Sequence, residues 1–221
     1  YLCRCQIIRL DSKKQTERKI LKIDSNLKSA DKGNYRHFME KEIYEQPQAV
    51  LNTLDGRVGG GDVREDIFGK GSSELFKKVK RIQIVACGTS LHAARVASNW
   101  LSSISGIPTQ IDYASEYRYR NPHVDKDSLF VTISQSGETA DTLAALKYSE
   151  EKDYLSSVTI CNAPTSSIAR ESKYFFYTNA GPEIGVASTK AFTTQLVGLM
   201  LLALSLAKSR NMNPKLRNRI I

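Results

Sequence analysis

Hydroxyl and amide side chains gather in one short segment of this chain, from Ser134 to Thr139. Its sequence, Ser-Gln-Ser-Gly-Glu-Thr, offers three hydroxyls and one carboxamide as neutral hydrogen-bond donors, and Gly137 lets a ligand approach the backbone. The segment lies between an apolar stretch at 129–133 and a helical pattern at 140–149. A helix N-terminus at such a turn presents free amide groups and a favourable dipole to an anion. The segment therefore predicts a phosphate site.

The kind of phosphate ligand is narrowed by two motifs that the segment lacks. It has neither the lysine of a P-loop nor the G-x-G-x-x-G spacing of a dinucleotide site. A small phosphorylated molecule is therefore favoured over a nucleoside triphosphate.

Three other turns combine hydroxyl side chains with the start of a predicted helix. They are Cys87–Ser90, Asn162–Ser167 and Gly185–Lys190. Serine and threonine are common N-cap residues, so each turn taken alone is interpreted as a cap. Because the carboxyl ends of parallel strands meet at one edge of a sheet, we expect Thr89, Ser90 and Ser188 to share a rim with the Ser134–Thr139 turn.

Charged side chains near these turns allow more than one interpretation. Lys190 falls in a first helical turn, and a solvated lysine is favoured there over a ligand contact. Glu183 could act as an acid or base, but a carboxylate that caps backbone groups is the simpler interpretation. Glu138 and Asp141 would repel a phosphate, so we expect both to point away from it. No acid–base pair, nucleophile or metal spacing is evident, so we assign no catalytic residue, metal or cofactor.

The elements that must position these turns alternate between strand and helix from residue 72 onward. Strands are predicted at 82–87, 110–113, 129–133, 157–161 and 174–177, and helices at 90–104, 139–149, 166–171 and 188–208. The strands at 82, 129 and 157 are continuous apolar runs, as in a parallel sheet covered on both faces. This pattern predicts an α/β fold with an open, doubly wound parallel sheet. Residues 35–54 have helical character interrupted at Pro47, and the Gly-rich residues 57–71 predict a loop.

The net charge of +9 would suit a nucleic-acid-binding protein if it lay on the folded domain. Residues 1–41 hold 11 basic and 5 acidic side chains, and residues 208–221 hold 5 basic and no acidic ones. The residues between them hold 16 basic and 18 acidic side chains, a net charge of −2. The excess therefore belongs to the two ends, and we expect no nucleic-acid partner.

Composition favours a soluble protein, with 41% hydrophobic and 25% charged residues. The longest apolar run, 196–207, is shorter than the ~20 residues that a bilayer needs. It predicts a core helix, and we expect no membrane partner. Cys87 and Cys161 close apolar strands, and Cys3 and Cys5 have no further ligands nearby, so we expect unpaired thiols and a cytoplasmic location. The chain does not begin with methionine, so we expect part of a longer protein.

Several of these motifs together resemble the sugar isomerase (SIS) domains of the glucosamine-6-phosphate synthase family. The segments that carry the resemblance are Cys87–Ser90, Ser134–Thr142, Glu183–Phe192 and Gly33–Pro47. The similarity extends from about Asp31 to Ala207, and the amino-acid sequences of these motifs are closer to those of bacterial members than to those of animal members. It implies a three-layer, flavodoxin-like five-stranded sheet and a glutamine:fructose-6-phosphate aminotransferase. In this family a glutaminase domain releases ammonia, two SIS domains make glucosamine 6-phosphate from fructose 6-phosphate, and the enzyme is a homodimer.

The resemblance also implies roles for particular residues. The phosphate would be held by Ser90, Ser134, Gln135, Ser136 and Thr139, and the sugar contacted by Val186 and Ser188, with Thr89 and Ala187 beside them. The family's Schiff-base lysine, ring-opening histidine and proton-transferring glutamate belong to a second SIS domain and a C-terminal tail. This sequence contains neither, so the chain is expected to bind substrate without catalysing the reaction alone.

The resemblance divides the chain into four parts. These are the end of a glutaminase domain with a linker (1–34), leading helices and a loop (35–71), the SIS domain (72–209) and a basic tail or linker to a second SIS domain (210–221). Two other functions stay open. One is a phosphosugar-sensing module, which would need a helix-turn-helix domain; the other is a free-standing aldose–ketose isomerase, which would need its own catalytic base.

Overall fold

The computed structural model describes residue 8, residues 11–15 and residues 31–210, within two compact units, Tyr1–Asp31 and Lys32–Ile221. In the first unit an isolated antiparallel bridge joins Ile8 to Gln15. Residues 1–7, 9–10, 16–30 and 211–221, which include Cys3 and Cys5, lie outside the described residues.

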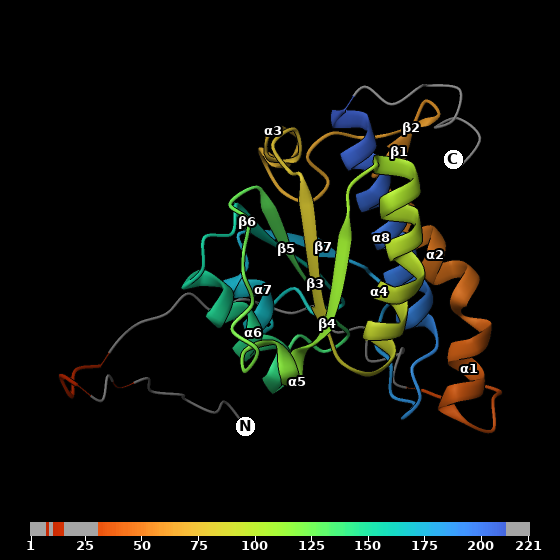
Figure 1. Cartoon of the computed structure of the whole chain (residues 1–221). Helices are drawn as coiled ribbons and strands as arrows, with labels where there is room; N and C mark the ends of the chain where they lie inside the picture. Colours follow the sequence, from red (N-terminus) through yellow and green to blue (C-terminus); the bar gives the residue numbers. More distant parts are fainter. Residues whose placement is uncertain (1–7, 9–10, 16–30, 211–221) are drawn as a thin grey trace. The chain divides into compact units, whose positions relative to one another are not determined.

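A five-stranded parallel sheet forms the centre of the second unit (Figure 1). Its strands, in spatial order, are β4 (Thr109–Tyr113), β3 (Arg81–Ala86), β5 (Ser128–Ser134), β6 (Ser156–Cys161) and β7 (Tyr174–Tyr177). All neighbouring strands are parallel. The chain leaves β3 to form β4 on one side and then crosses to β5 on the other, so the sheet has its switch point between β3 and β5. The predicted doubly wound, flavodoxin-like sheet is confirmed.

Helices cover both faces of the sheet, which gives three layers (Figure 1). The helices are α1 (Phe38–Tyr44), α2 (Gln46–Leu54), α3 (Ser72–Phe76), α4 (Gly88–Trp100), a π-helical turn η2 (Leu101–Ser105), α5 (Ala114–Tyr117), α6 (Ala140–Glu150), α7 (Ser167–Glu171) and α8 (Lys190–Ser209). The short helices α3 and α5 were not predicted, and each spans little more than one helical turn.

Side-chain alternation along the strands builds a separate hydrophobic core on each face. Ile82 and Ile84 of β3 belong to the cluster that includes α4 and α8, whereas Val85 belongs to the cluster with α5, α6 and α7. Successive strand residues point to opposite faces. Both faces are buried, which explains why β3 and β5 are continuous apolar runs in the sequence.

The segment before the sheet differs in part from the prediction. Pro47 lies in the first turn of α2, where its missing N–H breaks no helical bond, so the predicted interruption between two helices is confirmed. The predicted loop at 57–71 instead contains a hairpin of β1 (Val58–Gly59) and β2 (Asp62–Val63). Gly60 and Gly61 both have positive φ angles, as a two-residue hairpin turn requires. Two-residue strands show no alternation, so the sequence pattern could not reveal them.

Helix α8 is the long apolar helix that the sequence predicted. Among the described residues it is the one helix that is long and apolar enough to cross a membrane. The apolar run at 196–207 has only 12 residues, so the sequence pattern did not indicate this. In the fold, 67% of its most apolar window is buried. It packs against α4, α2 and η2, so its role as a core helix is confirmed.

We expect Gly198→Ala in α8 to destabilise the protein even though alanine favours helices. A Cβ atom at Gly198 would lie 2.9 Å from Cε1 of Phe176 and 3.2 Å from Cγ2 of Ile160. Overpacking costs about 1–3 kcal/mol and the gain in helix propensity is about 1 kcal/mol, so we expect a net loss of about 1 kcal/mol. Urea unfolding measures it, and a more stable variant would show that the packing yields at this point.

Candidate functional site

Three of the predicted turns lie side by side at the carboxyl edge of the sheet, the lower edge in Figure 1. The register pairs Ala86 of β3 with Ile133 of β5, and Ser134 of β5 with Cys161 of β6. The turns that leave these strands are Cys87–Ser90, Ser134–Thr139 and Asn162–Ser167. The first two flank the switch point, which is where open α/β sheets bind ligands.

The Ser134–Thr139 turn is tightened by its own hydroxyl groups. Ser134 Oγ accepts the N–H of Gly137 at 2.9 Å and lies 3.2 Å from Thr139 Oγ1. Ser136 Oγ accepts the N–H of Glu138 at 3.2 Å. Ser134 is 2% exposed, whereas Ser136 is on the surface. The turn is therefore rigid at its base and open at its rim.

The two helices that begin at the switch point have no side-chain caps. The N-cap residues Cys87 of α4 and Thr139 of α6 make no capping bond. Among the described residues, the side chains of Thr89, Ser90 and Gln135 also have no hydrogen-bond partner. The cap interpretation made for the Cys87–Ser90 turn is therefore wrong, and the Ser134–Thr139 turn is likewise uncapped. Amide groups, hydroxyls and a carboxamide stay available to an anion there.

The neighbouring helix α7 shows what an ordinary cap looks like in this fold. Ser166 Oγ accepts the N–H of Ala169 at 3.3 Å, so the cap interpretation is confirmed for this turn. The carboxylate of Glu138 also reaches this helix and accepts the N–H of Ser167 at 2.8 Å. That hydrogen bond holds the pKa of Glu138 below its ordinary value. The carboxylate of Glu138 is thus bonded to the first residue of α7, in agreement with the expectation that it points away from a phosphate.

Gly137 is the tightest point of the site. It has a φ of +68°, and a Cβ atom there would lie 2.0 Å from Ser166 Oγ and 2.9 Å from Cys161 Sγ. Cys161 is buried, and burial raises the pKa of its thiol. The predicted role of Cys161 as a small hydrophobic residue at a strand end is confirmed.

The loop before α8 carries the other predicted site residues. Glu183 Oε1 accepts the N–H groups of Thr189 at 2.8 Å and Ala191 at 3.1 Å, so its predicted capping role is confirmed. Ser188 Oγ donates to Glu183 Oε2 at 3.2 Å, and Val186 is fully exposed. Ala187 is exposed as well.

The start of α8 reaches the same edge as the start of α4, along which α8 packs (Figure 1). Among the described residues, no hydrogen bond joins residues 186–188 to the two turns at the switch point. The shared rim therefore stays a prediction for Val186, Ala187 and Ser188.

Lys190 differs from the prediction of a solvated side chain. It is 4% exposed, and its Nζ lies 2.6 Å from Glu45 Oε2. A buried cation at a helix N-terminus opposes the helix dipole, and the carboxylate of Glu45, between α1 and α2, compensates its charge.

Sequence reasoning also missed Asn162, whose side chain accepts the N–H of Ala180 at 2.8 Å and donates to the carbonyl of Gly181 at 2.7 Å. Its position directly after a strand was the available signal.

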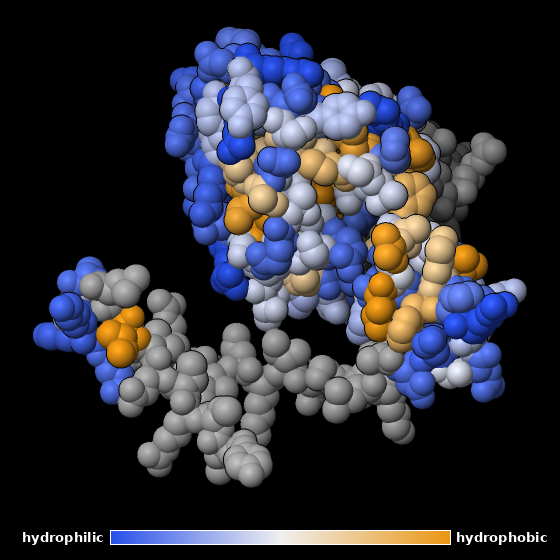
Figure 2. Space-filling view, turned by 90° about the horizontal axis from the view of Figure 1, so that it is seen from below, coloured by the Kyte–Doolittle hydropathy of each residue, from blue (hydrophilic) through white to orange (hydrophobic). Residues whose placement is uncertain are grey.

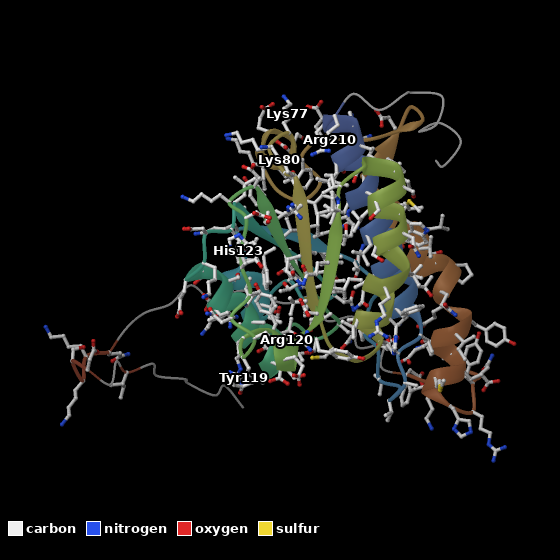
Figure 3. All side chains as sticks on the ribbon, viewed as in Figure 1. Lys77, Lys80, Tyr119, Arg120, His123 and Arg210 are labelled. Atoms are coloured by element: carbon white, nitrogen blue, oxygen red, sulfur yellow. The ribbon has the colours of Figure 1, made fainter. Side chains whose placement is uncertain are left out.

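The four lysine and arginine side chains labelled in Figure 3 do not supply the candidate anion site. Figure 3 shows Lys77, Lys80 and Arg210 at the opposite edge of the sheet, where Lys77 pairs with Glu74, Lys80 with Asp127, and Arg210 bonds to a backbone carbonyl. Arg120 lies at the site's edge, but its guanidinium pairs with the buried Asp112 at 2.8 Å. The described residues contain no group of three or more His, Cys, Asp and Glu that could hold a metal. The candidate site is thus built from neutral donors.

The class of protein is defined by two features: the doubly wound sheet, and the hydroxyl-rich turns that begin the helices at its switch point. Residues 75–205 match the model of the SIS domain, which is more than half of the chain, so the chain belongs to the SIS domain family. The predicted resemblance is confirmed at this level.

Particular relatives narrow this class. The chain is 58% identical over 192 residues to a glutamine–fructose-6-phosphate aminotransferase (isomerizing) of Pseudomonas aeruginosa, in a match that covers 87% of this chain and 31% of the relative. It is 51% identical over 201 residues to the enzyme of that name from Escherichia coli K12, covering 90% and 33%. The chain thus spans about a third of the length of these relatives.

A solved structure agrees with these relatives. The C-terminal domain of the glucosamine-fructose-6-phosphate aminotransferase from Francisella tularensis superposes with a TM-score of 0.83 and 49% identity. The match covers 86% of this chain and 54% of the other. The bacterial character of the resemblance is confirmed by these matches.

Proposed function

We propose that this chain is the sugar-phosphate-binding part of a glutamine:fructose-6-phosphate aminotransferase, acting in amino-sugar synthesis. The observation that carries the proposal is the pair of uncapped helix starts that flank the switch point. The 58% identity to the Pseudomonas enzyme supports this substrate over the two other candidates, a phosphosugar sensor and a free-standing isomerase.

In this proposal the phosphate binds between the N-termini of α4 and α6. Its ligands are Ser90, Ser134, Gln135, Ser136 and Thr139. Neutral donors suit a phosphate dianion, because hydrogen bonds to a charged acceptor are strong and the two helix dipoles add positive potential. Val186, Ala187 and Ser188 contact the sugar, and Thr89 lies beside them. We assign no catalytic residue to the described part of the chain.

We also propose that the protein is a cytoplasmic homodimer. Figure 2, which views the carboxyl edge, shows apolar side chains gathered on the side of α1. The exposed apolar residues there include Met39 and Ile43 of α1, which form a surface of the kind that partners cover. Cys87 and Cys161 are unpaired, as in a reducing compartment.

Thermal unfolding with added ligand tests the proposed function. We expect fructose 6-phosphate, glucosamine 6-phosphate and inorganic phosphate each to raise the melting temperature, because a ligand that binds only the folded state stabilises it. The two sugar phosphates should do so at lower concentration than phosphate. Equal potency would contradict the sugar contacts, and no shift with any of the three would contradict the site. Sodium chloride at matched ionic strength is the control for general salt effects.

A further inference from the structure

A buried carboxylate lies on an otherwise exposed helix. Glu42 of α1 is 2% exposed, although the two residues that follow it, Ile43 and Tyr44, are on the surface. Its Oε1 accepts the N–H of Ile184 at 2.5 Å and that of Gly185 at 3.1 Å, and its Oε2 accepts the latter at 3.1 Å. The side chain thus fastens a loop that is 142 residues away in sequence.

The contact between Glu42 and the loop is specific. Burying an ionised carboxylate is costly unless hydrogen bonds replace its water, and here backbone amides replace it. A Cβ atom at Gly185 would lie 2.6 Å from Glu42 Oε2 and 3.4 Å from Cα of Met39. A glycine at this position is therefore what lets the loop come close enough for its amides to bond.

The same loop is held at its other end. Lys190 Nζ lies 2.6 Å from Glu45 Oε2, so the junction of α1 and α2 also binds the first residue of α8. Glu183 closes the loop internally through Thr189 and Ala191. Between Gly185 and Thr189, the residues Val186, Ala187 and Ser188 are exposed or half-buried. Neither Glu42 nor Glu45 reaches the phosphate-binding turn.

We propose that Glu42 is a positioning residue that sets the sugar side of the site from outside the SIS domain. It holds residues 184–188 in the conformation that contacts the sugar, while the Ser134–Thr139 turn holds the phosphate independently. This inference rests on the proposed function. It separates two parts of ligand affinity, one for the phosphate group and one for the hexose.

Calorimetric titration of the full chain with fructose 6-phosphate and with inorganic phosphate tests the proposal. We expect Glu42→Ala to weaken fructose 6-phosphate binding about tenfold, the effect of losing hydrogen bonds to a charged group, and to leave phosphate binding unchanged. Glu42→Gln should restore most of the sugar affinity, because its carboxamide oxygen still accepts the amides of Ile184 and Gly185. Glu40→Ala is the matched control, since Glu40 is an exposed carboxylate on the same helix.

Several results would overturn the inference. Equal losses for fructose 6-phosphate and phosphate, or no loss for either, would show that Glu42 has only a structural role. Hydrogen exchange of the amides of Ile184 and Gly185, measured without ligand, is a second readout, and unchanged exchange in Glu42→Ala would overturn the inference directly. If the unsubstituted chain bound neither ligand while exchange in Glu42→Ala increased, the proposed function would fail but the fastening of the loop would stand.

Discussion

Replacing Ser134 with alanine and Thr139 with valine together is expected to lower the affinity for both fructose 6-phosphate and inorganic phosphate about 100-fold. Each hydroxyl would donate to a charged acceptor, and such a bond contributes about 1.5–3 kcal/mol, so losing two at the lower end of that range accounts for about that factor. Both hydroxyls lie together, 3.2 Å apart, at the base of the turn. The measurement is calorimetric titration of each ligand with the variant and the unsubstituted chain.

A matched pair of substitutions controls for general effects at the same edge. Thr165→Val with Ser167→Ala removes two hydroxyls from the neighbouring turn, where Ser166 caps α7 without involving the candidate site. This pair should leave both affinities unchanged. Unchanged affinity in the variant with both Ser134→Ala and Thr139→Val would show that the phosphate does not bind at this turn. The proposed function would then be contradicted.

The second large effect concerns Gly137. We expect Gly137→Ala to destabilise the protein by about 3 kcal/mol, because a positive φ costs an L residue about 1–2 kcal/mol and a buried clash adds more. The new Cβ would meet Ser166 Oγ at 2.0 Å and Cβ at 2.4 Å, so the start of α7 has to move. Equilibrium unfolding in urea measures the change.

Gly88 offers the control for Gly137. It has a φ of +55° at the start of α4, but a Cβ atom there has nothing within 4 Å. Gly88→Ala should therefore cost only the backbone strain, about 1–2 kcal/mol. If the two variants lost the same stability, the contact of Gly137 with α7 would not be what constrains this turn.

The positions of the strands could be predicted well because the cause is local. β5 is buried at every position, and a continuous run of apolar residues is the direct record of a strand covered on both faces. The failures have an equally physical cause. β1 and β2 have two residues each, and α5 has four, so none of these three elements is long enough to show a periodic pattern in the sequence.

Hydroxyl side chains at helix starts illustrate the limit of local reasoning about the site. Ser166 and Thr139 occupy equivalent N-cap positions and both fit the cap pattern, yet only Ser166 makes the capping bond. The difference arises because Ser134 Oγ lies beside Thr139 and Glu138 turns to α7. Sequence patterns predicted where the turns are, and the contacts between turns determined which hydroxyls stay available.

By itself, the sequence determined the parallel sheet, the turn at Ser134–Thr139 and the SIS family, because apolar periodicity and short motifs are properties of neighbouring residues. Only the tertiary structure decided the partners of Lys190 and Glu42. These partners lie more than 140 residues away in the chain, and packing of α2, which follows α1 directly, against α8 brings them together. A charged residue's burial depends on that packing, so no pattern around Lys190 could distinguish a solvated lysine from one held by Glu45.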